Sequence, residues 1–156
     1  MKKEIFLLLT VTLLLFGCSK QEESKKEVKT EKKVQIDIDK LKEEYLKLNT
    51  TEYIEKYIQK VIKNGSKGHG FLEEMPGNIV DEKTAKLISY YVVELTGRKS
   101  THPKEAKTSQ IFYTSNCGSC HGENGKGIKN SAPDLTKKHY LGIEDRRKEI
   151  ERLLKK

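Results

Sequence analysis

The sequence is short of apolar residues and of cysteine, and both shortages narrow what the chain can be. Hydrophobic residues make up 35% of its 156 residues, and charged residues make up another 35%. This small number of apolar residues suits one small domain with tails. A small domain with few core residues gains stability from a buried prosthetic group. Only Cys117 and Cys120 of the three cysteines form a pair. The chain therefore lacks the second pair that a four-cysteine zinc site requires.

No apolar run in the sequence is long enough to span a bilayer comfortably. The run from Ile5 to Phe16 follows two lysines and has the length of a signal-peptide core. It leads into Leu15-Phe16-Gly17-Cys18, which resembles a bacterial lipobox. The resemblance implies a signal peptide over residues 1–17, cleavage before Cys18 and a lipid anchor on that cysteine. An uncleaved anchor and a plain secretory signal are the alternatives.

The segment after the lipobox predicts a flexible tether over residues 18–35. It is almost entirely Lys, Glu, Ser, Gln and Thr, and cannot bury enough apolar area to fold. The formal net charge of +8 could suit nucleic acid, an anionic membrane or an acidic protein. An exported protein does not meet nucleic acid, and the charges of both signs are mixed throughout the chain. A nucleic-acid-binding protein is therefore the least expected of the three. The expected location is the cell envelope, on the periplasmic or extracytoplasmic face of a bacterial membrane.

The alternating pattern of a half-buried strand is absent, so the predicted fold is all-α. Apolar residues with helical spacing occur in segments 38–48, 53–62, 87–95 and 143–154. Asn49 with Glu52 predicts a helix start, and Asn64-Gly65 predicts a helix end. Asp81 predicts a further cap, and Gly97 a further end.

One more helix is expected in front of the cysteine pair. Pro103 is a favourable first residue for it, and it is expected to continue to Tyr113. A glycine-rich loop around the cysteines should follow. The arrangement places the cysteine pair outside regular structure.

Residues Cys117-Gly118-Ser119-Cys120-His121 form a C-x-x-C-H motif, the attachment signature of c-type haem. Two thiols at this spacing can each add to a vinyl group on one edge of the porphyrin, and the following histidine lies below the iron. Small residues between the cysteines let the backbone approach the ring. Half of a zinc site and a thiol–disulfide pair are the alternatives. The motif predicts one covalent haem c.

The sequence around this motif resembles the class I cytochrome c family. The likeness begins at Tyr113, includes Cys117–Gly127 and ends with Ala132-Pro133-Asp134-Leu135. The resemblance implies that Pro133 packs against His121 and that its carbonyl accepts the imidazole N–H. It also implies that the helix of Tyr113 crosses a second aromatic-bearing helix, with a small residue, here Ser109, at the crossing.

The other half of that family's pattern stands in front of the motif. In the family, the parts that follow the haem motif are a helix that stops at Asn-Gly, a Met-Pro loop and a helix with an aromatic residue. The same parts occur here in the same order: Asn64-Gly65, Met75-Pro76 and the helix of Tyr91. The resemblance therefore implies a circularly permuted cytochrome c domain over residues 36–156. Its Met-ligand half is residues 36–99, and its C-x-x-C-H half is residues 100–156.

A faint internal repeat has the spacing that a tandem duplication would leave. Segment 52–64 matches segment 144–156 at a shift of 92 residues. One copy of the duplicated helix is expected to fill the slot in front of the methionine loop. A monomer and a swapped dimer are both compatible with the halves.

The implied function is single-electron transfer between membrane-associated redox partners of a respiratory chain. His121 would be the fifth iron ligand and Met75 the sixth, so the iron would carry electrons and the chain would not be an enzyme. His69 is a competing ligand, and Met75 could instead be a core methionine. With an open distal site, the chain would be a haem enzyme or a sensor of gas or peroxide. A structural lipoprotein with a Cys117–Cys120 disulfide is a further alternative.

Overall fold

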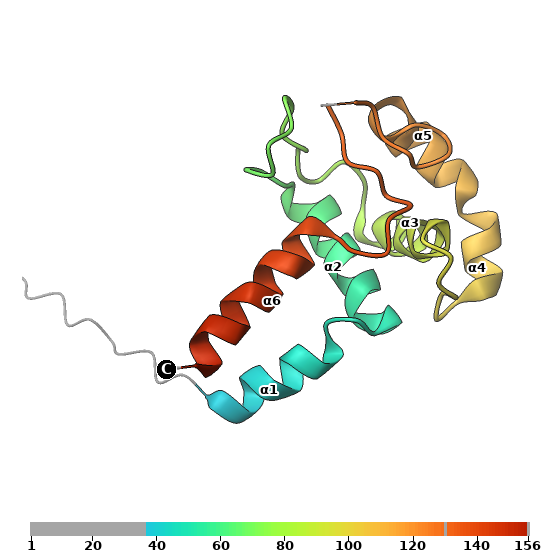
Figure 1. Ribbon diagram of the computed structural model, residues 1–156. Coiled ribbons are helices and arrows are strands. Elements are labelled where there is room, and N and C mark those ends of the chain that lie inside the picture. The colour runs from blue at the N-terminus through green and yellow to red at the C-terminus, as the bar shows by residue number, and fades with distance from the viewer. Residues whose placement is uncertain (1–36, 130, 156) are drawn as a thin grey trace, which may run out of the picture. The chain divides into compact units, whose positions relative to one another are not determined.

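A computed structural model describes residues 37–129 and 131–155, and this part of the chain is helical (Figure 1). The helices are α1 Ile38–Lys47, α2 Thr51–Asn64, α3 Glu82–Leu95, α4 Pro103–Thr108, α5 Gln110–His121 and α6 Leu141–Leu154. Within these ranges the only β pairing is two isolated bridges, Ser66 with Met75 and Ile128 with Ala132. The all-α prediction is confirmed. The predicted signal peptide, the lipidated Cys18 and the tether over residues 18–35 lie outside the described residues.

Short polar side chains start three of the helices. Asp37 accepts from the backbone N–H of Lys40, and Asp81 accepts from that of Thr84, at 3.1 and 3.0 Å. The cap of α2 is Thr50, whose hydroxyl accepts from the Tyr53 N–H at 3.3 Å. The predicted start at Asn49 was therefore wrong by one residue, since Asn and Thr are both good caps and the neighbouring turn decides between them.

The helix predicted from Pro103 is interrupted at Ser109. The Ser109 hydroxyl donates to the Glu105 carbonyl at 2.6 Å, and its N–H turns to Ala106 instead, at 3.1 Å. A serine that takes the carbonyl four residues back competes with the helical ladder. Two shorter helices, α4 and α5, result, and Ser109 is fully buried where they meet.

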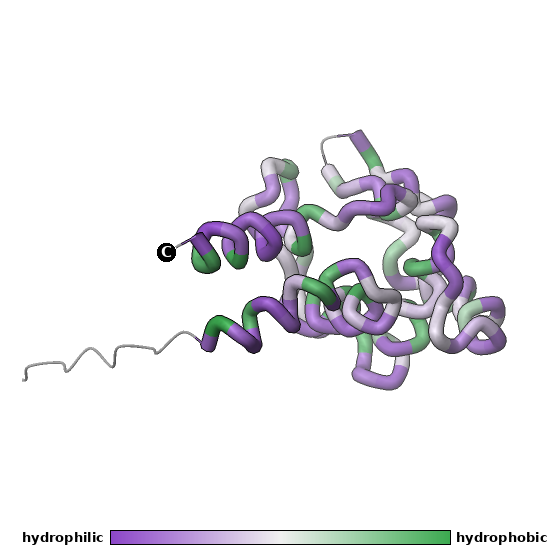
Figure 2. Tube along the Cα trace, turned by 60° about the horizontal axis from the view of Figure 1, so that its bottom comes forward, coloured by the Kyte–Doolittle hydropathy of each residue, from purple (hydrophilic) through white to green (hydrophobic). Residues whose placement is uncertain are grey.

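The described residues share one small apolar core. Its buried members are Leu41, Leu48, Ile54, Ile58, Ile62, Ala85, Ile88, Val92, Val93, Tyr113, Cys117, Ile143 and Ile150. Helix α3 packs against α2, α4 and α5, whereas α1 packs against α6. Burying each large aliphatic side chain contributes about 1.5–3 kcal/mol. Figure 2 shows how sparse this supply is along α6, where isolated hydrophobic positions interrupt a hydrophilic helix.

Polar contacts join α1 to α6. Arg146 binds both carboxylate oxygens of Glu44, at 2.9 and 2.6 Å, and also reaches Glu149 at 2.7 Å. The Tyr45 hydroxyl donates to Glu151 at 2.9 Å. Residues about a hundred positions apart in sequence are thus held together by a bidentate pair, the geometry in which arginine binds carboxylates best.

None of the helices in the described residues combines the length and the apolar character needed to cross a membrane.

Candidate functional site

The segment that carries Met75 is fastened to the end of α2. Met75 and Ser66 exchange two backbone hydrogen bonds, both of 3.0 Å. Asn78 then donates to the carbonyls of Ile62 and Lys63, at 3.0 and 2.9 Å. Gly65 lies at φ +76°, and a Cβ there would collide with the Met75 carbonyl. The backbone of Met75 therefore has a fixed place beside the last turn of α2.

The C-x-x-C-H motif forms the last turns of α5. The prediction that the cysteines lie in a glycine-rich loop is wrong, because the helix continues through His121 and the loop begins at Gly122. Gly122 takes φ +74°, a left-handed conformation that ends the helix. Cys117 and His121 are one helical turn apart and both are buried, whereas Cys120 is exposed.

The imidazole of His121 is oriented by the chain itself. Its Nδ1 lies 3.3 Å from the Pro133 carbonyl, and a carbonyl can only accept, so Nδ1 carries the proton. Nε2 is left with a free lone pair. Burial lowers the pKa of His121, and the contact with Pro133 opposes this. The neutral imidazole that results is the form that binds metals.

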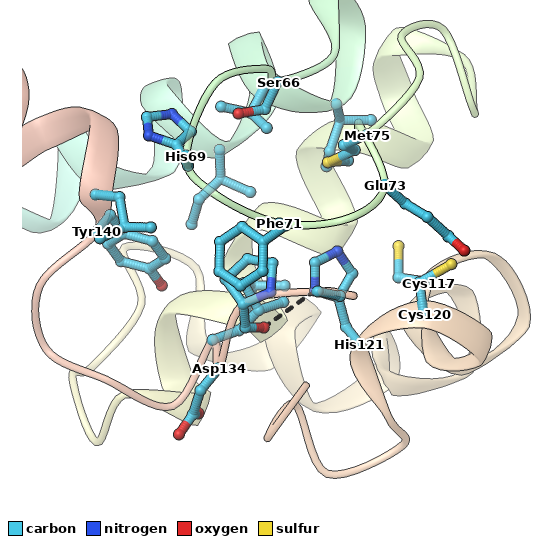
Figure 3. A pocket seen from close by; sticks show the side chains of 18 of the residues that line it. Ser66, His69, Phe71, Glu73, Met75, Cys117, Cys120, His121, Asp134 and Tyr140 are labelled. Atoms are coloured by element: carbon cyan, nitrogen blue, oxygen red, sulfur yellow. Dashed lines mark hydrogen bonds between the residues drawn. The ribbon is translucent and has the colours of Figure 1, made fainter. Parts of the chain in front are cut away.

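These residues line one cavity of about 460 Å³, whose walls come from both halves of the chain. Met75 lies on one side of it and His121 on the other (Figure 3). The volume falls in the range of about 300–1,000 Å³ that is usual for small-molecule and cofactor sites. The residues that the sequence predicts as cofactor-binding, namely Met75, Cys117, Cys120, His121 and Pro133, all line this cavity.

The two cysteines are free thiols, so the structure gives no support to a disulfide between them. Burial, with a smaller effect from Cys120, raises the pKa of the Cys117 thiol to about 11. That thiol is protonated at neutral pH and is a poor thiolate ligand. No group of three His, Cys, Asp or Glu side chains converges within the described ranges, so a zinc cluster is not formed there.

Tyr140 marks the end of the cavity away from the cysteines (Figure 3). Its hydroxyl is buried and has no hydrogen-bond partner among the residues described. Burial also raises the pKa of Tyr140, which keeps the phenol protonated as a donor. Leaving such a donor unpaired costs about 1–3 kcal/mol. The hydroxyl oxygen is itself closed off from the cavity, so Tyr140 lines the cavity with its ring.

His69 also lines the cavity, but Met75 and not His69 lies across from His121 in Figure 3. The Nδ1 atom of His69 is 3.6 Å from the Asp145 carboxylate on α6. His102 stacks on Tyr90 at a centroid distance of 4.4 Å and lies at the start of α4. His139 is mostly exposed, beside Glu144. The prediction that these last two are surface or helix-end residues is confirmed.

Sequence reasoning missed Tyr140 as a site residue. It stands alone between His139 and Leu141, outside any periodic pattern. Only the folded chain shows that Tyr140 lines the cavity. The two segments of the faint internal repeat lie in different places. Helix α2 lines the cavity along its second half, whereas α6 packs on α1 and contributes only its first residue, Leu141, to the cavity.

Comparison with known proteins gives a partial but consistent likeness. Residues 105–156 match the cytochrome c family. The chain is 42% identical over 89 residues to the Cbb3-type cytochrome c oxidase subunit CcoP of Helicobacter pylori strain ATCC 700392/26695, which covers 53% of this chain and 31% of the relative. It is 37% identical over 67 residues to CcoP of Rhodobacter capsulatus, covering 40% of this chain and 22% of that protein. No solved structure matches.

The chain thus spans less than a third of the length of these relatives. The Helicobacter likeness covers a larger share of the chain than residues 105–156 supply, so it extends in front of residue 105. A cytochrome c domain implies covalently bound haem c and a part in electron transfer. The cavity, the C-x-x-C-H turn and these likenesses together identify the chain as one that carries a cytochrome c domain and is homologous to the oxidase subunit CcoP over part of its length.

Proposed function

We propose that the protein carries single electrons through one haem c, attached at Cys117 and Cys120 and ligated by His121 and Met75. The observation that supports this most is that Met75 and His121 occupy opposite sides of one cavity, with both thiols at one end. Haem has its vinyl groups on one edge and its carboxylates on the other. The thiols suit the first edge, and His121 and Met75 offer a nitrogen and a sulfur from opposite sides of the cavity, so the residues present fit the group.

The chain's own residues have distinct parts in this proposal. Haem supplies a reversible one-electron change at iron. The Pro133 carbonyl holds the His121 ring with Nε2 toward the cavity and raises its basicity. Met75 offers a thioether, a soft ligand that favours the ferrous state and raises the reduction potential. If His121 and Met75 both bound the iron, they would leave no place on it for small molecules.

We infer that both halves of the site belong to one chain, in permuted order, over residues 36–156. The Met-ligand half, 36–99, and the C-x-x-C-H half, 100–156, both line the cavity. The likeness to CcoP, which extends in front of residue 105, supports a continuous homologous stretch that includes part of the first half. A single chain would then complete the site as a monomer, without a partner.

We also propose a place in the cell and a class of partner. Lipid on Cys18 would hold the protein to the outer face of a bacterial membrane, and residues 18–35 would let the domain reach its partners. The relatives are subunits of a Cbb3-type cytochrome c oxidase. A membrane respiratory complex of that kind is the redox partner that we propose.

The test is spectroscopic and starts from protein exported in a host that attaches haem. The mass should rise by roughly six hundred daltons, the mass of a haem joined through such a motif. The ferric protein should show a weak far-red band from the thioether ligand. Met75→Ala should remove that band, lower the potential and let the ferrous iron bind carbon monoxide.

Leu72→Ala is the matched control, because Leu72 is in the same loop and 81% exposed. It should leave the band and the potential unchanged. Protein without haem would refute the cytochrome proposal. Wild-type protein that already binds carbon monoxide would refute the closed electron carrier and favour an enzyme or a sensor.

A further inference from the structure

A buried carboxylate lies where the two halves of the chain meet. Glu55, on α2, is only 4% exposed. It forms no ion pair within residues 37–129 and 131–155. A buried charge is costly unless hydrogen bonds replace its water. Glu55 must therefore be held by other polar groups.

Three donors hold Glu55, and all belong to the segment that starts the C-x-x-C-H half. Ser100 Oγ donates to Oε1 at 2.9 Å, and the Thr101 N–H donates to the same oxygen at 2.9 Å. The Thr101 hydroxyl donates to Oε2. Ser100 Oγ in turn accepts from the His102 N–H at 3.0 Å, at the first turn of α4. The carboxylate thus ties the start of α4 to the flank of α2.

The two elements that meet at Glu55 lead to the two proposed iron ligands. Helix α2 runs nine residues further to Asn64, about 14 Å of helix, and then holds the Met75 segment. Helices α4 and α5 run from Pro103 to His121. A shift where α2 and α4 are tied would change the separation of Met75 and His121 across the cavity.

We propose that Glu55 is a positioning residue for the axial pair, setting the distance between Met75 and His121 through α2 and α4–α5. The inference rests on the proposed function, because it requires both side chains to bind one iron. It assigns Glu55 no contact with the cofactor. Its effect should appear in the strength of the iron–methionine bond.

A carboxylate suits this task better than an amide. All three partners donate, and a carboxylate accepts at both oxygens, whereas glutamine accepts at only one. Glu55→Gln keeps the size of the side chain but puts an NH2 group where Oε2 accepts, so the Thr101 hydroxyl would have to turn its proton toward His102 Nδ1, 2.7 Å away. Glu52→Gln is the matched control, since Glu52 is on the same helix and exposed.

The experiment compares the haem-loaded, full-length variants. In Glu55→Gln the equilibrium constant for methionine ligation of the ferric iron, followed by the far-red band on heating, should fall about threefold or more. Carbon monoxide should bind faster to the ferrous form by a similar factor. Glu52→Gln should match the wild type. Adding Thr101→Val to Glu55→Gln should have little further effect, because both substitutions remove the same contact, between the Thr101 hydroxyl and Glu55.

The outcomes separate the two proposals. If Glu55→Gln lowers the melting temperature but leaves the band and carbon monoxide binding unchanged, Glu55 is only structural and the inference is overturned. If Glu55→Gln does not fold, Ser100→Ala removes one donor and should shift the same readouts in the same direction. A wild-type band that does not depend on Met75 would overturn the proposed ligation and this inference together.

Discussion

The ring of Tyr91 lies 5.2 Å from the ring of Tyr113, centroid to centroid, with 45° between their planes. Tyr91 is on α3 and Tyr113 is on α5, so the contact joins the two halves of the chain. Tyr113 is fully buried, and its hydroxyl donates to the Gly122 carbonyl at 2.7 Å. One side chain thus packs the helix crossing and also holds the turn that follows His121.

Removing only the hydroxyl of Tyr113 should weaken this turn. Burial raises the pKa of Tyr113, so the phenol stays protonated and donates throughout the neutral range. Tyr113→Phe should lower the free energy of unfolding by about 1–2 kcal/mol, since the Gly122 carbonyl loses its donor. Denaturant unfolding measures this change in the free energy of unfolding. Tyr91→Phe is the control, and an equal loss in both variants would contradict this account.

Replacing Gly127 should disturb the support of His121. A Cβ at Gly127 would lie 2.5 Å from the Ala132 carbonyl oxygen and 2.8 Å from Pro133. Gly127→Ala should therefore displace the carbonyl that orients His121, beyond the cost of about 1–2 kcal/mol for its left-handed backbone. The haem-loaded variant should show an altered low-spin spectrum and lower stability.

Gly97→Ala provides the matched control for that experiment. Gly97 has nearly the same φ, +76° against +75°, but a Cβ there meets nothing within 4 Å. Gly97→Ala should lower the stability by the backbone strain alone and leave the spectrum unchanged. Identical spectra and stabilities for the two variants would show that the contact with Pro133 is unimportant.

The Glu44–Arg146 pair should make stability depend on pH in the acid range. The hydrogen bond from Arg146 holds the pKa of Glu44 below its usual value. Its contribution is therefore complete above the unfolded pKa of about 4.3 and is lost as the pH falls through the lower folded pKa. Glu44→Gln should cost about 0.5–1 kcal/mol at pH 7, a small value because both side chains are about one-third exposed.

Unfolding of the wild type and Glu44→Gln at pH 7 and near pH 3 would check this. The difference between the two proteins should shrink at the lower pH. Glu43→Gln is the control, because within the described residues Glu43 pairs only with Lys47, on its own exposed helix face. A difference that grows on acidification would have the opposite sign and refute the assignment.

Mixing two defective chains should not restore methionine ligation if one chain supplies both ligands. A Met75→Leu chain keeps the haem attachment site, and a Cys117→Ser/Cys120→Ser chain keeps Met75. Unfolded and refolded together, they should show no far-red band, whereas wild type treated alike should regain it. A band in the mixture, with a dimeric mass, would show that the halves exchange between chains.

Local patterns in the sequence were enough to predict most of the helices. The apolar period, Asp81 and the Asn64-Gly65 stop act within a few residues, and the structure places α2 and α3 where these signals predict. The C-x-x-C-H motif likewise predicts its own chemistry from spacing alone. The errors came where competing local contacts had nearly equal energy: Thr50 capped α2 in place of Asn49, and the Ser109 hydroxyl divided one helix into two.

The arrangement of the cavity could be decided only by tertiary packing. Met75 and His121 are 46 positions apart, and nothing in their immediate neighbours fixes the space between them. Glu55 reads as an ordinary charged residue of an amphipathic helix until the fold brings Ser100 and Thr101 to it. The sequence by itself determined most of the helix positions and the C-x-x-C-H pattern, because those depend on short-range geometry. The tertiary structure decided which side chains share a cavity, because burial and long-range hydrogen bonds exist only once the helices have packed.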